Sequence, residues 1–195
     1  RLLGLPVVVT GLPSLQGPCV VVSNHASILD SLLLMAAWPQ PLRFAIAPWV
    51  SRLDVLRVLI RRHGHLSVVR GRADQARQGL DRMADILRSG CSLAGFPEGG
   101  IEVTPGLRPF MLGLFQAAGR AGVPVVAVAL RGTRRALPWP HLVPRPGPLL
   151  CEGVAVLHPQ GDSLEQAAAL AREARARIAE RCGEALTGQR LTRED

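Results

Sequence analysis

Short apolar runs rich in valine alternate along the chain with longer segments in which apolar residues recur at helical spacing. Such runs, bounded by turn residues, are typical of buried strands, whereas the 3.6-residue period is typical of amphipathic helices. The predicted strands are 6–10, 19–23, 43–47, 65–69, 92–95, 125–130 and 149–153. The predicted helices are 28–37, 50–62, 74–88, 110–121 and 164–186. This alternation indicates an α/β fold with a mixed, largely parallel sheet flanked by helices.

Three segments carry a more detailed prediction. In 74–88, Leu80, Met83 and Leu87 recur at helical spacing, Asp74 is a plausible cap, and Gly90 suits a left-handed residue after the helix. Segment 50–62 has an apolar stripe flanked by arginines, which fits an interfacial helix and an ordinary core helix alike. Segment 136–148 contains five prolines, so we expect an extended surface loop.

The size of the chain fits one domain. With 195 residues, 48% of them hydrophobic, the chain can bury a full core, and we expect a single domain over 1–195. Because the chain begins at Arg1 rather than at methionine, we expect this domain to be excised from a longer chain. No apolar run approaches the roughly 18 residues needed to span a bilayer.

The net charge is +8, and all 23 basic residues are arginine. Nucleic-acid binders usually add stacking aromatics, but aromatic residues make up 4% here and tyrosine is absent. A phosphorylated small molecule or an anionic membrane surface therefore fits better than nucleic acid. The four cysteines lie far apart and show no CxxC spacing, so we expect reduced core thiols in a cytoplasmic protein.

A histidine and an aspartate five residues apart carry the candidate chemistry. His25 follows the predicted strand 19–23, and Asp30 falls in the first turn of the next predicted helix. From there the carboxylate can fold back to one imidazole nitrogen, fix the tautomer and stabilise the imidazolium. The pair then acts as a base without a serine or cysteine nucleophile, taking its proton from a substrate hydroxyl. Asp30 would also stabilise the helix start if it had no catalytic role.

Four segments, in order, resemble motifs of one family. They are Asn24–Asp30 with its His-x4-Asp pattern, 64–70 with a glycine before a strand ending in Arg70, Phe96-Pro97-Glu98-Gly99-Gly100, and 123–129. Together they resemble the glycerophospholipid acyltransferase family, the relatives of 1-acylglycerol-3-phosphate acyltransferase. The resemblance covers roughly residues 20 to 132 and implies a glycerol-3-phosphate acyltransferase-like fold.

The resemblance also implies roles for further residues. Glu98 would hydrogen-bond hydroxyls of the acceptor, and Gly99 would let the backbone approach it closely. Arg70 would bind the acceptor phosphate, with Arg72 assisting and Arg131 as a weaker candidate. The donor would be acyl-CoA or acyl-carrier protein, and the acceptor a glycerol-phosphate-like or lysophospholipid alcohol. The protein would be peripheral on the inner, cytoplasmic face of the membrane.

The third motif departs from the family pattern. Gly100 replaces a threonine, and Met111 occupies the place of a lysine. Arg108 is charged but does not take the same position. The acceptor's identity therefore stays open, and so do two alternatives: an acyl thioesterase, in which the base activates water, and a catalytically silent lipid-binding domain of the same fold.

Other catalytic signatures are absent from the sequence. There is no Gly-x-Ser-x-Gly elbow, no Walker loop and no His-Glu-x-x-His, so we expect neither metal nor cofactor. Direct attack by the acceptor is then favoured over an acyl-serine intermediate. Backbone amides at the start of the helix after His25 are the candidate donors for the developing oxyanion.

Overall fold

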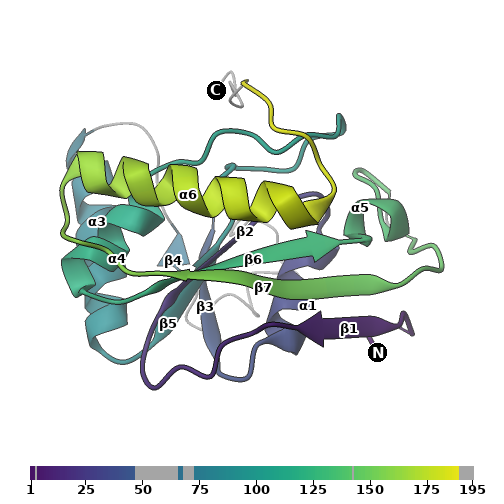
Figure 1. The fold of residues 1–195 in the computed structure, drawn as a ribbon, viewed down its shortest axis with the longest axis horizontal. Coiled ribbons are helices and arrows are strands. Elements are labelled where there is room, and N and C mark those ends of the chain that lie inside the picture. The colour runs from purple at the N-terminus through teal and green to yellow at the C-terminus, as the bar shows by residue number, and fades with distance from the viewer. Residues whose placement is uncertain (3, 47–65, 68–72, 142, 189–195) are drawn as a thin grey trace.

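The computed structural model describes residues 1–2, 4–46, 66–67, 73–141 and 143–188. The strands are β1 (Val7–Thr10), β2 (Val20–Ser23), β3 (Leu42–Ile46), β4 (Leu66–Ser67), β5 (Ser92–Gly95), β6 (Val125–Arg131) and β7 (Leu149–Leu157). The helices are α1 (Leu29–Ala37), α3 (Ala73–Arg88), α4 (Gly113–Ala121), α5 (Thr133–Ala136) and α6 (Leu164–Cys182). Figure 1 shows the strands side by side in one sheet, with helices on both sides of it.

The sheet has seven strands in the order β1-β7-β6-β2-β5-β3-β4. All neighbouring pairs are parallel except β6 and β7, which run antiparallel. The central strand β2 is buried along its whole length, because helices cover both faces of the sheet. This explains why its sequence is a continuous valine run rather than an alternating pattern. The predicted α/β fold with a mixed, largely parallel sheet is confirmed.

Two apolar cores lie on opposite faces of the sheet. On one face, α3, α4 and α6 pack Leu87, Phe115 and Ile178 against Val20 and other strand residues. On the other face, Leu29 and Leu33 of α1 lie in a second cluster with Val21 and Leu149. Consecutive residues of β2 thus serve different cores, as the alternation of side chains along a strand requires. None of the helices in the described part of the chain is long and apolar enough to cross a membrane.

Two helix boundaries differ from the predicted ones by three and four residues. The fourth predicted helix begins at Gly113 rather than at residue 110, because the Met111 amide donates to the Pro97 carbonyl over 2.8 Å and the preceding residues join that loop. The last helix ends at Cys182 rather than at residue 186, because Gly183 adopts a left-handed conformation with φ of 77°. Glycine at this position is a common helix terminator.

β7 also departs from prediction, since it continues past the expected end at Gly153 to Leu157. A Cβ on Gly153 would lie 2.2 Å from the Gly11 carbonyl oxygen, so this glycine marks a close approach of two backbones rather than a strand end. The four-residue helix α5 was not predicted, and the proline-rich segment after it is a loop, as expected.

The helix predicted at 74–88 is confirmed as α3. It begins one residue earlier than expected, so Asp74 lies in its first turn rather than before it. Of the strand predicted at 65–69, Leu66–Ser67 is seen as β4, and its other residues lie outside the described part of the chain. The helix predicted at 50–62 also lies outside it.

Candidate active site

Three residues in or just after the motif segments lie at one edge of the sheet, where parallel strands end. His25 follows the carboxyl end of β2, and Phe96 follows the end of the parallel neighbour β5. Arg131 ends β6, the parallel neighbour on the other side. In open α/β sheets this edge is where ligands bind.

His25 and Asp30 are in contact. The Nδ1 atom of the His25 ring lies 3.1 Å from Oδ2 of Asp30, whose side chain is fully buried. Because a carboxylate only accepts hydrogen bonds, the neutral ring carries its proton on Nδ1 and its lone pair on Nε2. The His25 side chain remains 17% exposed. The geometry therefore orients the His25 ring at the sheet edge through Asp30, which lies in the first turn of α1 as the sequence indicated.

The expected oxyanion donors are engaged elsewhere. The amides of Ala26 and Ser27 both donate to Oδ2 of Asp30, over 2.6 and 2.7 Å. The Leu29 amide donates to Oγ of Ser27. The first two amides hold the Asp30 carboxylate and the third binds the Ser27 hydroxyl, so the expectation that they are free for an oxyanion was wrong for these three.

Phe96 supports the base from one side. Its ring is stacked on the His25 imidazole, with centroids 3.9 Å apart and an angle of 9° between the planes. Phe44 lies behind Phe96 at a centroid distance of 6.1 Å. The stack limits rotation of the imidazole and covers one of its faces with an apolar surface. The first residue of the Phe-Pro-Glu-Gly motif thus contacts the candidate base His25 directly.

Glu98 joins two loops through its carboxylate. Oε1 accepts the backbone amide of His25 over 2.8 Å, and Oε2 accepts the backbone amide of Arg108 over 2.9 Å. The residue is 5% exposed, and burial raises the pKa of its carboxyl, although the two amide hydrogen bonds and the Arg108 guanidinium oppose that shift. The geometry gives Glu98 a task besides the hydroxyl binding expected from sequence, because it fixes the backbone of His25.

Gly99 closes the turn after the motif glutamate. Its amide donates to the Phe96 carbonyl over 3.1 Å, and its φ of 92° lies in the region that side chains disfavour. Next to this turn, Arg108 is buried, and its guanidinium donates to the Gly100 carbonyl over 2.6 Å. Arg108 therefore stabilises the inside of the loop.

The sequence analysis missed two positioning residues beside His25. Asn24 is buried and pairs with the backbone of Leu130 on β6 through both its amide oxygen and its amide nitrogen, over 2.8 and 3.0 Å. Oγ of Ser27 donates to the Leu137 carbonyl over 2.7 Å. Short polar residues directly after a buried strand were the available signal, since buried polar groups need partners.

An ion pair between Arg134 and Glu184 supports the loop between Gly99 and α4. Nε of Arg134 lies 2.7 Å from Oε1 of Glu184, and Oε2 of Glu184 accepts the Gly106 amide over 2.9 Å. Arg175 of α6 donates to the Leu107 carbonyl over 2.6 Å. These contacts tie the motif loop to α5, to α6 and to the chain after it.

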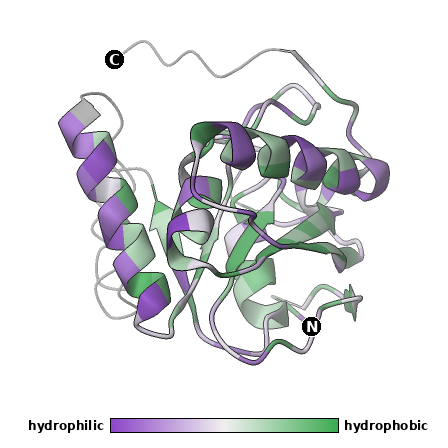
Figure 2. Cartoon of the chain, turned by 60° about the vertical axis from the view of Figure 1, so that its left-hand side comes forward, coloured by the Kyte–Doolittle hydropathy of each residue, from purple (hydrophilic) through white to green (hydrophobic). Residues whose placement is uncertain are grey.

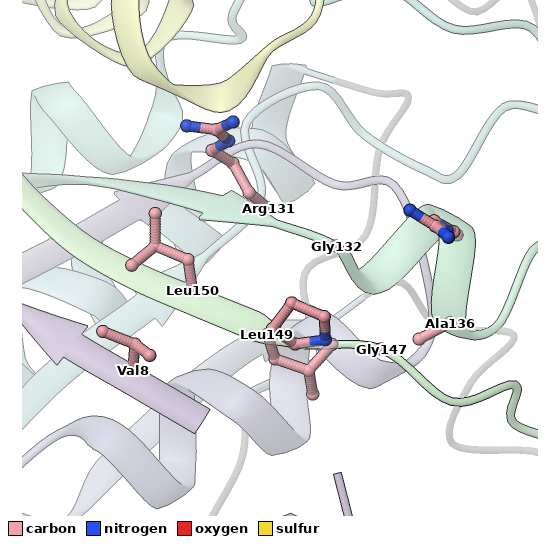
Figure 3. Close-up of a pocket in the computed structure, with 9 residues that line it drawn as sticks. Val8, Arg131, Gly132, Ala136, Gly147, Leu149 and Leu150 are labelled. Carbon is pink, nitrogen blue, oxygen red and sulfur yellow. The ribbon is translucent and has the colours of Figure 1, made fainter. Parts of the chain in front are cut away.

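The predicted phosphate ligands are only partly placed. Arg70 and Arg72 lie outside the described part of the chain, so their role stays a prediction. Arg131 is exposed and lines a pocket of about 360 Å³ together with Arg135, Val8 and Leu150. Figure 3 shows Val8, Leu149 and Leu150 on β1 and β7, with Arg131 extending from the end of β6. This pocket does not include His25 or Asp30.

The cysteines show no sign of disulfide or metal chemistry in the described residues. All four are free thiols, and Cys19, Cys151 and Cys182 are buried. Burial raises the pKa of Cys151 to about 12. The described residues contain no group of side chains able to hold a metal ion. That the reaction needs no metal or cofactor stays a prediction.

Known proteins resemble this chain in sequence and in fold. The chloroplastic 1-acyl-sn-glycerol-3-phosphate acyltransferase of Brassica napus is 33% identical over 127 residues, which are 65% of this chain and 37% of that protein. The 1-acyl-sn-glycerol-3-phosphate acyltransferase of Neisseria gonorrhoeae is 31% identical over 123 residues, 62% of this chain and 48% of that protein. The chain thus spans less than half the length of these relatives.

The crystal structure of the 1-acyl-sn-glycerophosphate acyltransferase from Thermotoga maritima has the same fold. It superposes with a TM-score of 0.72 at 23% identity, covering 90% of this chain and 72% of that one. The family model described as Acyltransferase matches residues 6–131, which contain His25, Asp30, Phe96 and Glu98. The chain therefore belongs to the acyltransferase family.

Proposed function

We propose that the protein is an O-acyltransferase that moves a fatty acyl group from a thioester to a hydroxyl of a 1-acylglycerol-3-phosphate-like lysophospholipid. The observation that carries the proposal is the contact between His25 and the buried Asp30 at the ligand-binding edge of the sheet. The relatives that match this region are named for transfer to 1-acyl-sn-glycerol 3-phosphate. Acyl-CoA or acyl-carrier protein would be the donor.

The proposed reaction needs one group that first accepts a proton and later gives it back. Nε2 of His25 takes the proton of the acceptor hydroxyl as its oxygen attacks the thioester carbonyl carbon. The tetrahedral intermediate then collapses, the carbon–sulfur bond breaks, and the leaving thiolate takes the proton back from the imidazolium. Asp30 stabilises the imidazolium through Nδ1, and the Phe96 stack keeps the ring in place. The products are an ester and a free thiol.

The acceptor would be held mainly by arginine. Arg70, assisted by Arg72, would bind the phosphate in two-pronged fashion, as the family resemblance implies. Gly99 would let the backbone approach the glycerol part, and Glu98 would contact a hydroxyl only through lone pairs left beside its two amide bonds. In this proposal the enzyme works as a peripheral protein on the inner face of the membrane, where it would meet its lipid acceptor.

Release of free thiol from palmitoyl-CoA tests this proposal. The acceptors would be glycerol 3-phosphate, lysophosphatidate and other lysophospholipids, and each reaction would be repeated with acyl-carrier protein as the carrier. We expect release that requires one acceptor and falls at least about 100-fold in His25→Ala. Release without acceptor would identify a thioesterase. No release with any pair of substrates, together with unchanged lipid binding by His25→Ala, would identify a silent lipid-binding domain.

A further inference from the structure

The outer side of α1 carries exposed apolar residues directly beyond the candidate active site. α1 packs Leu29 and Leu33 against the sheet, whereas Ile28, Leu32 and Met35 are 37%, 39% and 40% exposed. Their spacing of four and three residues places these three on one side of the helix. In Figure 2, α1 is the helix drawn beside the N-terminus, and the side of it that is visible is green to pale, whereas α3 and α6 alternate with purple residues.

The loop after α5 adds a second exposed apolar segment. Trp139 is 40% exposed and Val143 is 77% exposed. The hydrogen bond from Oγ of Ser27 to the Leu137 carbonyl ties this loop to the residue before Ile28. The two apolar segments therefore start from adjacent points on the molecule.

The exposed charged residues on these two segments are all positive. Segments 26–41 and 133–148 together contain one acidic residue, Asp30, and that residue is fully buried. The second segment contains Arg134, Arg135 and Arg145. Arg135 and Arg145 are exposed, and neither forms an ion pair with any residue that the structure describes. Exposed cations thus lie beside exposed apolar side chains, with no exposed carboxylate among them.

We propose that Ile28, Leu32, Met35, Trp139 and Val143, with Arg135 and Arg145, form a docking face for an anionic lipid bilayer. Tryptophan and arginine beside apolar side chains suit the boundary between headgroups and acyl chains. A second copy of this chain fits less well, because it would bring the same arginines together with no exposed acid to pair them. The inference rests on the proposed function, since a bilayer-borne acceptor would then reach His25, which lies three residues before Ile28.

Vesicle co-sedimentation of the full chain tests the docking face. The vesicles contain phosphatidylcholine alone or phosphatidylcholine with phosphatidylglycerol, and they contain neither acyl donor nor lysophospholipid. Binding is therefore measured independently of thiol release, and failure of one proposal is distinguishable from failure of the other. The variants are Leu32→Gln with Met35→Gln, Val143→Gln alone, and Arg135→Gln with Arg145→Gln. Leu164→Gln is the matched control, because Leu164 is a 61% exposed leucine at the start of α6, on the opposite face of the sheet.

We expect the wild type to sediment with the anionic vesicles. The Leu32 and Met35 pair should weaken binding at least about tenfold. Each of the two arginines removed, Arg135 and Arg145, should weaken vesicle binding by about fivefold. This effect should occur only with the vesicles that contain phosphatidylglycerol. Val143 is an exposed loop residue, so Val143→Gln tests the docking face even if the Leu32→Gln, Met35→Gln double variant fails to fold. The control should bind as the wild type does.

Three results would overturn the docking face. The first is a wild type that stays in the supernatant with anionic vesicles. The second is equal binding by the wild type and the folded variants. The third is a wild-type dimer in analytical ultracentrifugation that the same substitutions disperse, which would assign the face to a second copy of the chain.

Discussion

Glu98→Gln separates a positioning role of this residue from an acceptor-binding role. Both carboxylate oxygens of Glu98 accept backbone amides, from His25 and from Arg108. A glutamine has the same shape but one acceptor oxygen, so its NH2 group would face one of the two amide N–H groups. One buried donor would lose its partner, and the other bond would lose its charge.

The cost of that change can be worked from the two contacts. An unsatisfied buried donor costs roughly 1–3 kcal/mol, and a hydrogen bond to a charged group contributes roughly 1.5–3 kcal/mol where a neutral one contributes about 1. We therefore expect the free energy of unfolding to fall by roughly 2–4 kcal/mol in Glu98→Gln. Urea denaturation measures it. Glu102→Gln is the matched control, since it makes the same chemical change on the same loop, and it should change stability by less than about 0.5 kcal/mol.

Kinetics then decide between the two roles. If Glu98 holds the backbone of His25, misplacing the base should lower kcat by roughly 10- to 100-fold and leave the acceptor KM within about twofold. If Glu98 mainly binds acceptor hydroxyls, the acceptor KM should rise while stability stays near that of the wild type. A stable Glu98→Gln variant with unchanged kcat would refute the positioning argument.

The same variant has a predicted pH dependence. Burial raises the pKa of the Glu98 carboxyl above its ordinary value of 4.5, so the folded state binds this proton more tightly than the unfolded chain does. The corresponding stability is present below pH 4.5 and is lost as the pH rises through the raised pKa. Glutamine does not titrate, so the free energy of unfolding of Glu98→Gln has no such decrease. The difference in that free energy between the wild type and the variant should therefore narrow with rising pH. A gap that widens over that range would contradict the burial argument.

Three further predictions concern the base and the core thiols. Asp30→Asn keeps an acceptor for the amides but removes the charge beside Nδ1, so kcat for thiol release should fall about 10- to 150-fold, and equal rates would refute the pairing. Phe96→Leu removes the stack on His25 and should lower kcat more than either KM, whereas a change in KM alone would assign Phe96 to substrate binding. Cys151, with its pKa near 12, should resist iodoacetamide at pH 8 until urea unfolds the chain, with the half-buried Cys91 as the reactive control in mass spectrometry.

The sequence by itself determined the layers of the fold and the pairing of His25 with Asp30. The valine run that became β2 and the helical spacing that became α3 are local patterns, and local periodicity is what a single sequence reveals best. The contact between His25 and Asp30 was predictable for the same reason, because it spans five residues across one turn.

The tertiary structure decided what the sequence left open, because those features join residues distant along the chain. The carboxylate of Glu98 reaches a backbone amide 73 positions away, and Asn24 pairs with Leu130 across 106 positions. β7 continues past Gly153 to Leu157 because these residues pair with β6, and no local pattern contains that pairing. Such partners are brought together only when the strands align in the sheet, so their roles follow from packing and not from the motif that contains them.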